Sequence, residues 1–194
     1  MLFYVNKHTL IPRFCTETLV EVAIRNAKPN GHILDLCTGS GSIACVLAFH
    51  DFKVTASDIS RKALKVARKN ARLYDLDIDF VCGDLLDAPG LAGKKFDAIV
   101  SNPPYIRTED IGKHDESILY EPRIAFDGGA EGYDFYHRIA RRAGDFLKPG
   151  GTLFLETCDR TASGVKSLLE LDGFKDVTIV RDVRGLDRVL MAKK

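Results

Sequence analysis

Residues 32–50 read HILDLCTGSGSIACVLAFH, and this stretch decides the fold. The run HILDLC, residues 32–37, is short and mostly apolar, which is typical of a buried strand. A turn with two glycines, TGSGS, follows it and leads into IACVLAFH, residues 43–50, whose apolar content favours a buried helix. A strand, a glycine turn and a helix in this order predict the first unit of an α/β domain.

The same alternation continues along the chain. KVTAS, residues 53–57, is predicted to be a second strand, and Ser60 is placed to cap the helix that follows it. Further strands are expected at residues 78–83, 96–101, 152–157, 175–180 and 187–192. Strands that alternate with helices predict a doubly wound, mostly parallel, seven-stranded sheet of the Rossmann-like α/β class. The last two strands have no helix between them, so we expect a C-terminal antiparallel hairpin.

Two further segments frame this alternation. Apolar residues recur at helical spacing from Thr16 up to Pro29–Gly31, and Thr18 with Glu21 is expected to form a capping box for this opening helix. Residues 102–132 form an irregular segment that is longer than most connections and precedes another helix. Long loops often carry function, so this segment is expected to border a site.

The composition predicts a single domain spanning residues 1–194. Of the 194 residues, 45% are hydrophobic and 28% are charged, which is ordinary for a globular protein. The formal net charge of +1 gives no strong nucleic-acid footprint, and there is no apolar run of the roughly 20 residues needed to cross a membrane. The cysteines form no CxxC pair and indicate reduced thiols, a cytoplasmic location and no metal site. They are Cys15, Cys37, Cys45, Cys82 and Cys158.

Glycines and carboxylates follow three successive predicted strands, at the ends where a doubly wound sheet binds ligands. The segment Asp35–Gly41 closes the first strand, and its glycines let a ligand approach the backbone at a helix N-terminus. Asp58 ends the second strand 23 residues after Asp35, near the spacing at which a carboxylate accepts hydrogen bonds from ribose hydroxyls. Asp84 follows the third strand and is placed to accept from an adenine amino group. Together they predict a nucleoside-bearing cofactor, although tight turns and helix caps also select glycine and aspartate.

Asn102-Pro103-Pro104-Tyr105, after the fourth predicted strand, is the most specific feature of the sequence. The two prolines remove two backbone donors and stiffen the turn, which leaves carbonyl oxygens and the Asn102 side chain free to face a ligand. The Asn102 oxygen and the Pro103 carbonyl can accept both hydrogens of a planar NH2 group, while Tyr105 packs against a flat substrate. The alternative is a structural polyproline turn with an aromatic cap.

With these residues in place, the chain resembles the S-adenosylmethionine-dependent class I methyltransferases. More narrowly, it is similar to the bacterial protein-(glutamine-N5) methyltransferases that modify peptide-chain release factors, the HemK/PrmC family. NPPY alone is also similar to adenine-N6 methyltransferases, whereas LIPR and YEP indicate the glutamine branch. The resemblance rests on LIPRFCTETLV (10–20), DLCTGSGSIA (35–44), IVSNPPYI (99–106), YEP (120–122), FDGGAEGYDFYHRI (126–139) and GLDRV (185–189).

The resemblance implies methyl transfer from S-adenosyl-L-methionine to the N5 amide nitrogen of a glutamine in the GGQ loop of class-one release factors, with S-adenosyl-L-homocysteine as product. Asn102, Pro103 and Tyr105 would be catalytic and, with Pro104, would bind the glutamine amide. For the cofactor, the resemblance implies Cys37, Thr38, Gly39, Ser40 and Gly41 at the methionine end, Asp58 at the ribose, Asp84 and Leu85 at the adenine, and Asn102 between cofactor and substrate.

The sequence departs from the family pattern in three places, one of which is Cys37, where the family often has Gly. Cys15 stands where the family has Glu, and only nine residues precede LIPR, where family members carry a separate N-terminal helical domain. We therefore expect the catalytic domain alone. The first alternative is an adenine-N6 methyltransferase acting on RNA or DNA, which the low net charge disfavours because Arg138, Arg141 and Arg142 lie on one predicted helix flanked by acids. The second is a non-catalytic cofactor-binding partner, which the intact NPPY turn disfavours.

Overall fold

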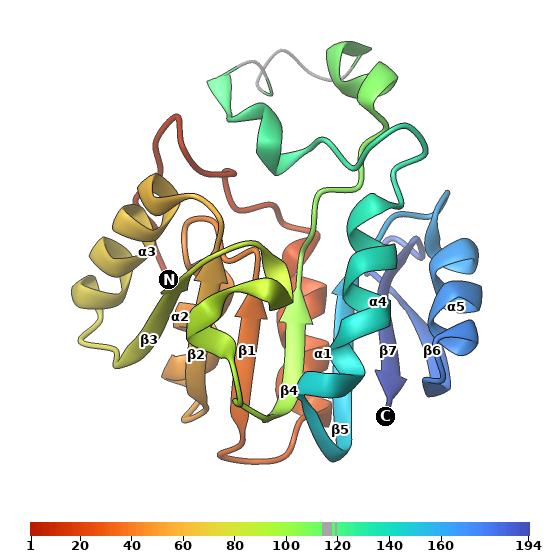
Figure 1. Cartoon of the computed structure of the whole chain (residues 1–194). Helices are drawn as coiled ribbons and strands as arrows, with labels where there is room; N and C mark the ends of the chain where they lie inside the picture. Colours follow the sequence, from red (N-terminus) through yellow and green to blue (C-terminus); the bar gives the residue numbers. More distant parts are fainter. Residues whose placement is uncertain (114–117, 119) are drawn as a thin grey trace.

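The computed structural model describes residues 1–113, 118 and 120–194, and in them the chain folds around a seven-stranded sheet of order β3-β2-β1-β4-β5-β7-β6 (Figure 1). Strands β1 to β5 pair in parallel, and β7 runs antiparallel to β5 and β6. The predicted doubly wound sheet with its C-terminal antiparallel hairpin is confirmed. The strands are β1 (His32–Leu36), β2 (Lys53–Asp58), β3 (Ile78–Cys82), β4 (Phe96–Ser101), β5 (Leu147–Glu156), β6 (Lys175–Arg181) and β7 (Asp187–Lys193).

Helices cover both faces of this sheet, as a buried parallel sheet requires. Two of them, α4 and α5, pack on one face, while α1, α2 and the inner side of α3 pack on the other (Figure 1). The helices are α1 (Thr16–Asn26), α2 (Ser42–Phe49), α3 (Arg61–Leu73), α4 (Asp134–Phe146) and α5 (Ala162–Leu171).

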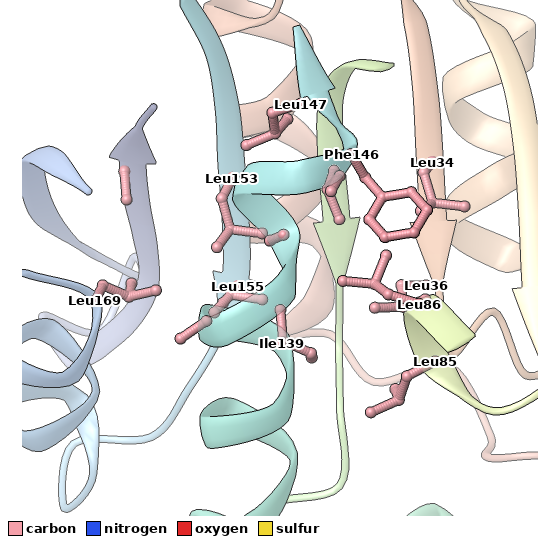
Figure 2. Packing of buried hydrophobic residues seen from close by; sticks show 14 of the residues in the cluster. Leu34, Leu36, Leu85, Leu86, Ile139, Phe146, Leu147, Leu153, Leu155 and Leu169 are labelled. Carbon is pink, nitrogen blue, oxygen red and sulfur yellow. The ribbon is translucent and has the colours of Figure 1, made fainter. Parts of the chain in front are cut away.

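The core therefore has two halves, one on each side of the sheet. Neighbouring residues of a strand point to opposite faces, so Leu34 and Leu36 join the cluster under α4 and α5, whereas Ile33 joins the cluster under α1 and α2. Figure 2 shows the first cluster, in which Ile139 of α4 and Leu155 of β5 meet the central strands. Burial on both faces explains why the strands read as continuous apolar runs.

The two predicted helix caps have different outcomes. Ser60 caps α3 as predicted, because its Oγ accepts a hydrogen bond from the Ala63 amide at 3.1 Å. The capping box predicted from Thr18 and Glu21 is wrong, since α1 already begins at Thr16 and both residues lie inside it. The preceding turn supplies carbonyl acceptors to the first amides of α1 instead, so no side-chain cap is needed.

Two of the differences between predicted and observed strand boundaries lie where the backbone is irregular. The first strand was expected to include Cys37, but β1 ends at Leu36 and Cys37 has a left-handed φ of 64°. The strand β5 begins at Leu147, not at residue 152, because Leu147 pairs with Phe96 of β4 ahead of a register shift. Residues 147–151 include residue types that are typical of turns, so the sequence pattern did not predict this part of the strand.

The described part of residues 102–132 lies over the carboxyl ends of the strands, as a long connection bordering a site should (Figure 1). Their described part contains short 3-10 turns at Thr108–Lys113 and Arg123–Ala125, and residues 114–117 and 119 lie outside the described residues. A bridge between Ile106 and Asp127 folds the segment back on itself. Among the residues that the model describes, no helix is both long and apolar enough to cross a membrane.

We expect Leu155→Ala to lower the free energy of unfolding by about 2 to 5 kcal/mol, because it removes a fully buried side chain from the cluster in Figure 2. Leu171→Ala is the matched control, since Leu171 is 87% exposed and its truncation should change stability by less than about 0.5 kcal/mol. Urea denaturation of both variants measures the difference. Equal effects would contradict this description of the core.

Candidate functional site

A cavity of about 210 Å³ lies at the carboxyl ends of β1, β2 and β4, where the strand order reverses direction. Its lining includes most of the residues predicted to hold a cofactor. The predicted residues that line it are Cys37, Thr38, Gly39, Ser40, Asp58, Asp84, Leu85, Asn102 and Pro104. Residues at the ends of separate strands are thus brought to one place, as the doubly wound fold predicts.

The glycine turn after β1 has two glycines with different roles. Gly39 has a left-handed φ of 56°, and a Cβ added there would meet nothing within 4 Å, so its backbone faces open space. Gly41 also has a positive φ, but a Cβ there would lie 2.8 Å from the Ala67 Cβ of α3. Gly41, predicted as a cofactor residue, is absent from the cavity lining and instead permits close packing of the turn against α3.

Asp35 stabilises this turn from the protein interior and does not line the cavity. It is fully buried, and its Oδ2 accepts from the Thr38 hydroxyl at 2.5 Å and from the Ala44 amide at 3.1 Å. Burial raises the pKa of Asp35 to about 7, against the opposing effect of these two hydrogen bonds. Sequence reasoning grouped Asp35 with the ligand-facing carboxylates, and the structure separates it from them.

Asp58, at the end of β2, is the carboxylate best placed to hold a diol. Its Oδ1 accepts from the Ser60 amide at 2.8 Å and its Oδ2 from the Gly39 amide at 2.9 Å. A carboxylate oxygen has two lone pairs, so each oxygen keeps one acceptor site for a hydroxyl group. Burial raises the pKa of Asp58, while the two backbone bonds lower it.

Asp84 and Leu85 close the cavity after β3. The Asp84 carboxylate forms a 2.7 Å ion pair with Arg138 of α4, and both side chains are nearly half exposed. Leu85 has a φ of 47° and a buried side chain, so it forms an apolar wall. Asp84 is therefore a partly exposed carboxylate at the edge of the cavity. Its ion pair with Arg138 was not predicted from the sequence.

The Asn102–Tyr105 turn lies between this cavity and a second hollow. Asn102 lines both spaces, whereas Pro103 and Tyr105 line the second one. The turn is tightly held: the Asn102 Nδ2 donates to Thr16 Oγ1 at 3.3 Å, and the Tyr105 hydroxyl donates to Glu156 Oε1 at 3.3 Å. Asn102 therefore lies at the junction of two adjoining sites.

The LIPR and YEP motifs, for which the sequence predicts no structural role, meet over the cavity. The LIPR segment contributes Arg13 and Ile11, which both donate to the Glu121 carboxylate of YEP; the Ile11 amide does so at 2.6 Å. The Glu121 side chain is almost fully buried. This contact, which no local sequence pattern reveals, ties the N-terminal segment to the long connection and holds both over the site.

Residues 14–117 match the family model described as the methyltransferase small domain. The release factor glutamine methyltransferase of Clostridium acetobutylicum is 41% identical over 98% of this chain and 69% of its own length, and that of Neisseria gonorrhoeae is 39% identical over 98% and 71%. The chain belongs to the release factor glutamine methyltransferase family.

Solved structures agree with this membership. The release factor-specific protein-(glutamine-N5) methyltransferase from Alicyclobacillus acidocaldarius is 31% identical and matches with a TM-score of 0.58 over 99% of both chains. A methyltransferase from Pyrococcus furiosus matches with a TM-score of 0.75 at 21% identity, over 99% of this chain and 88% of its own. At that identity the likeness shows the fold alone.

Membership of this methyltransferase family and fold implies use of S-adenosylmethionine, and the residues of the cavity fit that group. The free lone pairs of Asp58 suit two ribose hydroxyls, and the open backbone at Gly39 leaves room beside the turn. Among the described residues, no cluster of His, Cys, Asp and Glu could hold a metal ion.

We expect Asp58→Asn to weaken binding of S-adenosylhomocysteine at least about tenfold, because an Asn cannot accept both backbone bonds and still accept from two hydroxyls. Asp51→Asn is the control, since Asp51 is exposed and precedes the opposite end of β2. Titration calorimetry measures both affinities. Equal affinities in a folded Asp58→Asn variant would contradict this role for Asp58.

Asp35 makes stability depend on pH in an unusual direction. Its folded pKa is raised to about 7 from an ordinary value of 3.8, so between these values the folded state binds more protons than the unfolded state. The stability that Asp35 contributes is therefore present at low pH and is lost as pH rises towards 7, by roughly 1.4 kcal/mol per pH unit. Asp35→Asn cannot titrate. Urea denaturation at several pH values should show wild-type stability falling relative to the variant, and a constant difference would contradict the assignment.

Proposed function

We propose that this chain transfers a methyl group from S-adenosyl-L-methionine to the N5 amide nitrogen of a glutamine in the GGQ loop of class-one release factors. The observation that carries the proposal is the position of Asn102–Tyr105, which borders both the cavity beside the glycine turn and the adjoining hollow. Cofactor and substrate would then meet at Asn102. We also propose that residues 1–194 act as one catalytic domain in the cytoplasm.

The chemistry requires positioning above all. An amide nitrogen is a poor nucleophile because its lone pair is delocalised into the carbonyl group. The bound cofactor would supply an electrophilic methyl group on a sulfonium, which needs no further activation. The Asn102 oxygen and the Pro103 carbonyl would accept the two N–H groups of the glutamine amide and orient its nitrogen towards the cavity. Their dipoles would also stabilise the positive charge that develops on nitrogen.

Tyr105 would shape the amide site without transferring a proton. Burial raises the pKa of its hydroxyl well above the ordinary value, and the nearby Glu156 raises it further. The hydroxyl therefore stays protonated and continues to donate to Glu156. Its ring lines the hollow and offers a flat surface to the planar amide.

The charge distribution on α3 is the one observation that favours the alternative, an adenine-N6 methyltransferase. The net charge of the chain is close to zero, but α3 contains no acidic residue and its exposed face carries a set of basic side chains. Arg138 and Arg142 of α4, by contrast, pair with Asp84 and Asp87. The basic residues of α3 are Arg61, Lys62, Lys65, Arg68, Lys69 and Arg72. Such a face suits a phosphate backbone, so nucleic acids belong among the substrates offered.

We expect labelled methyl groups from S-adenosylmethionine to appear on the GGQ glutamine when a release factor, a tRNA and duplex DNA are offered in parallel. Mass spectrometry of each product locates the label. Label on adenine alone would overturn the proposal in favour of the second candidate. Binding of the cofactor without transfer to any substrate would instead indicate a non-catalytic partner.

Asn102→Ala should lower turnover by about 100-fold or more, because it removes one of the two acceptors that orient the amide. Thermal unfolding should change little, since the Asn102 side chain is only partly buried. Turnover close to that of the wild type in a folded Asn102→Ala variant would remove Asn102 from the mechanism.

A further inference from the structure

Residues 4–12, here called the strap, form a wall of the cavity proposed to hold the cofactor. His8, Thr9, Leu10 and Pro12 line this cavity together with the glycine turn. Thr9 is 1% exposed, so the strap is packed against the rest of the chain at this point. None of these four residues was predicted to contact a cofactor. The strap has neither helix nor strand structure, so its position depends on specific contacts with other elements.

Asn70, on the buried side of α3, holds the strap and the glycine turn at the same time. Its Oδ1 accepts from the Tyr4 amide at 2.8 Å, and its Nδ2 donates to the Tyr4 carbonyl at 2.9 Å. The same Nδ2 donates to the Ser40 carbonyl at 2.8 Å. These three bonds use both hydrogens and the oxygen of the amide, and the side chain is fully buried. Because Ser40 also lines the cavity, one side chain connects two of its walls.

The glycine turn contacts α3 at two positions that are nearly one helical turn apart. At the first, Gly41 lies so close to Ala67 that an added Cβ would be 2.8 Å from the Ala67 Cβ. At the second, Asn70 binds the Ser40 carbonyl. Residues three apart in a helix lie on the same face, so Ala67 and Asn70 form one contact surface for the turn. The strap is bonded to that same surface through Asn70.

The strap is held on both sides of the residues that line the cavity. Between Tyr4 and the cavity it forms a closed turn, in which the Asn6 Oδ1 accepts from the His8 amide at 3.0 Å and the Asn6 carbonyl accepts from the Thr9 amide at 3.0 Å. Further along, the Ile11 amide donates to the buried Glu121 carboxylate at 2.6 Å. The position that Asn70 gives to Tyr4 is therefore carried to the cavity by a constrained segment.

We propose that the strap is a binding wall for S-adenosylmethionine and that Asn70 is a positioning residue for this cofactor. By fixing the strap against the glycine turn, Asn70 keeps the cavity preformed, so less conformational entropy is lost when the cofactor binds. The inference rests on S-adenosylmethionine as the ligand of this cavity, whatever the acceptor of the methyl group. It assigns no contact between the cofactor and Asn70.

Asn70→Asp tests the positioning role. Asp keeps the size of Asn and an acceptor for the Tyr4 amide, but an ionised carboxylate cannot donate to the Tyr4 and Ser40 carbonyls. We expect the Kd for S-adenosylhomocysteine to rise about tenfold or more. Val66→Ala is the control, since Val66 is a buried residue of α3 that does not line the cavity. Its Kd, measured by titration calorimetry, should stay within about twofold of wild type.

An unchanged Kd in a folded Asn70→Asp variant would overturn the inference. An equal rise in Val66→Ala would also overturn it, because general destabilisation of α3 would then account for both effects.

Asn6→Ala tests the strap without any change to α3, so it decides the matter even where Asn70→Asp does not fold. It removes the acceptor that closes the strap turn, whereas Asn6→Asp keeps that acceptor. Asn6 does not line the cavity, so its effect on affinity must act through the position of the strap. We expect the Kd for S-adenosylhomocysteine to rise at least about threefold in Asn6→Ala and to stay within about twofold of wild type in Asn6→Asp. A rise in both variants, or in neither, contradicts a binding role for the strap.

Hydrogen exchange of the full chain separates this inference from the proposed function. The Tyr4 and Ile11 amides are bonded only while the strap is in place, so S-adenosylhomocysteine should slow the exchange of both in the wild type. Exchange that the ligand leaves unchanged would overturn the inference. These measurements involve no methyl acceptor. If they give the expected results but no glutamine is methylated, the proposed function fails and the role of Asn70 stands. If glutamine is methylated but the Asn70 and Asn6 variants bind like wild type, only the inference fails.

Discussion

The parallel pairing of β1 with β4 is the constraint on which the site depends. In this register Leu36 lies opposite Ser101, and the Ser101 hydroxyl donates to the Leu36 carbonyl at 2.7 Å in the buried interior. Each strand ends at that pair, so the next residues, Cys37 and Asn102, leave the sheet side by side. The glycine turn and the NPPY turn are therefore neighbours because two strands from distant parts of the sequence stop at the same level.

Two buried carboxyl groups accept hydrogen bonds from these two turns and hold them in place. Asp35 holds the glycine turn through Thr38 and Ala44, and Glu156 holds the NPPY turn through Tyr105. Each has one oxygen without a hydrogen-bond partner among the described residues, so the burial of each carboxyl group costs desolvation free energy. Asp35 is the penultimate residue of β1 and Glu156 is the last residue of β5, so a rigid strand backbone fixes each acceptor. The irregular turns above them thus gain defined positions from groups that never need to touch a ligand.

The sequence was sufficient for the fold because strands and helices alternate with little ambiguity, and for the NPPY turn because two prolines after a strand have few structural explanations. The roles of Asp35, Gly41 and Glu156 could not be predicted, because they depend on contacts with residues that are distant in the sequence. Gly41, for example, is required by the approach of Ala67 on the next helix. The net charge is an average over the chain, so it does not report the basic face of α3.

The cover of the site is built differently from its floor. Strand ends form the floor, so it follows from the sheet itself, whereas the cover comes from the N-terminal segment and the long connection. These two pieces are joined by Glu121, which accepts from Arg13 and Ile11. The floor therefore follows from strand pairing, whereas the cover depends on a contact between Ile11 and Glu121, which are 110 residues apart in the sequence.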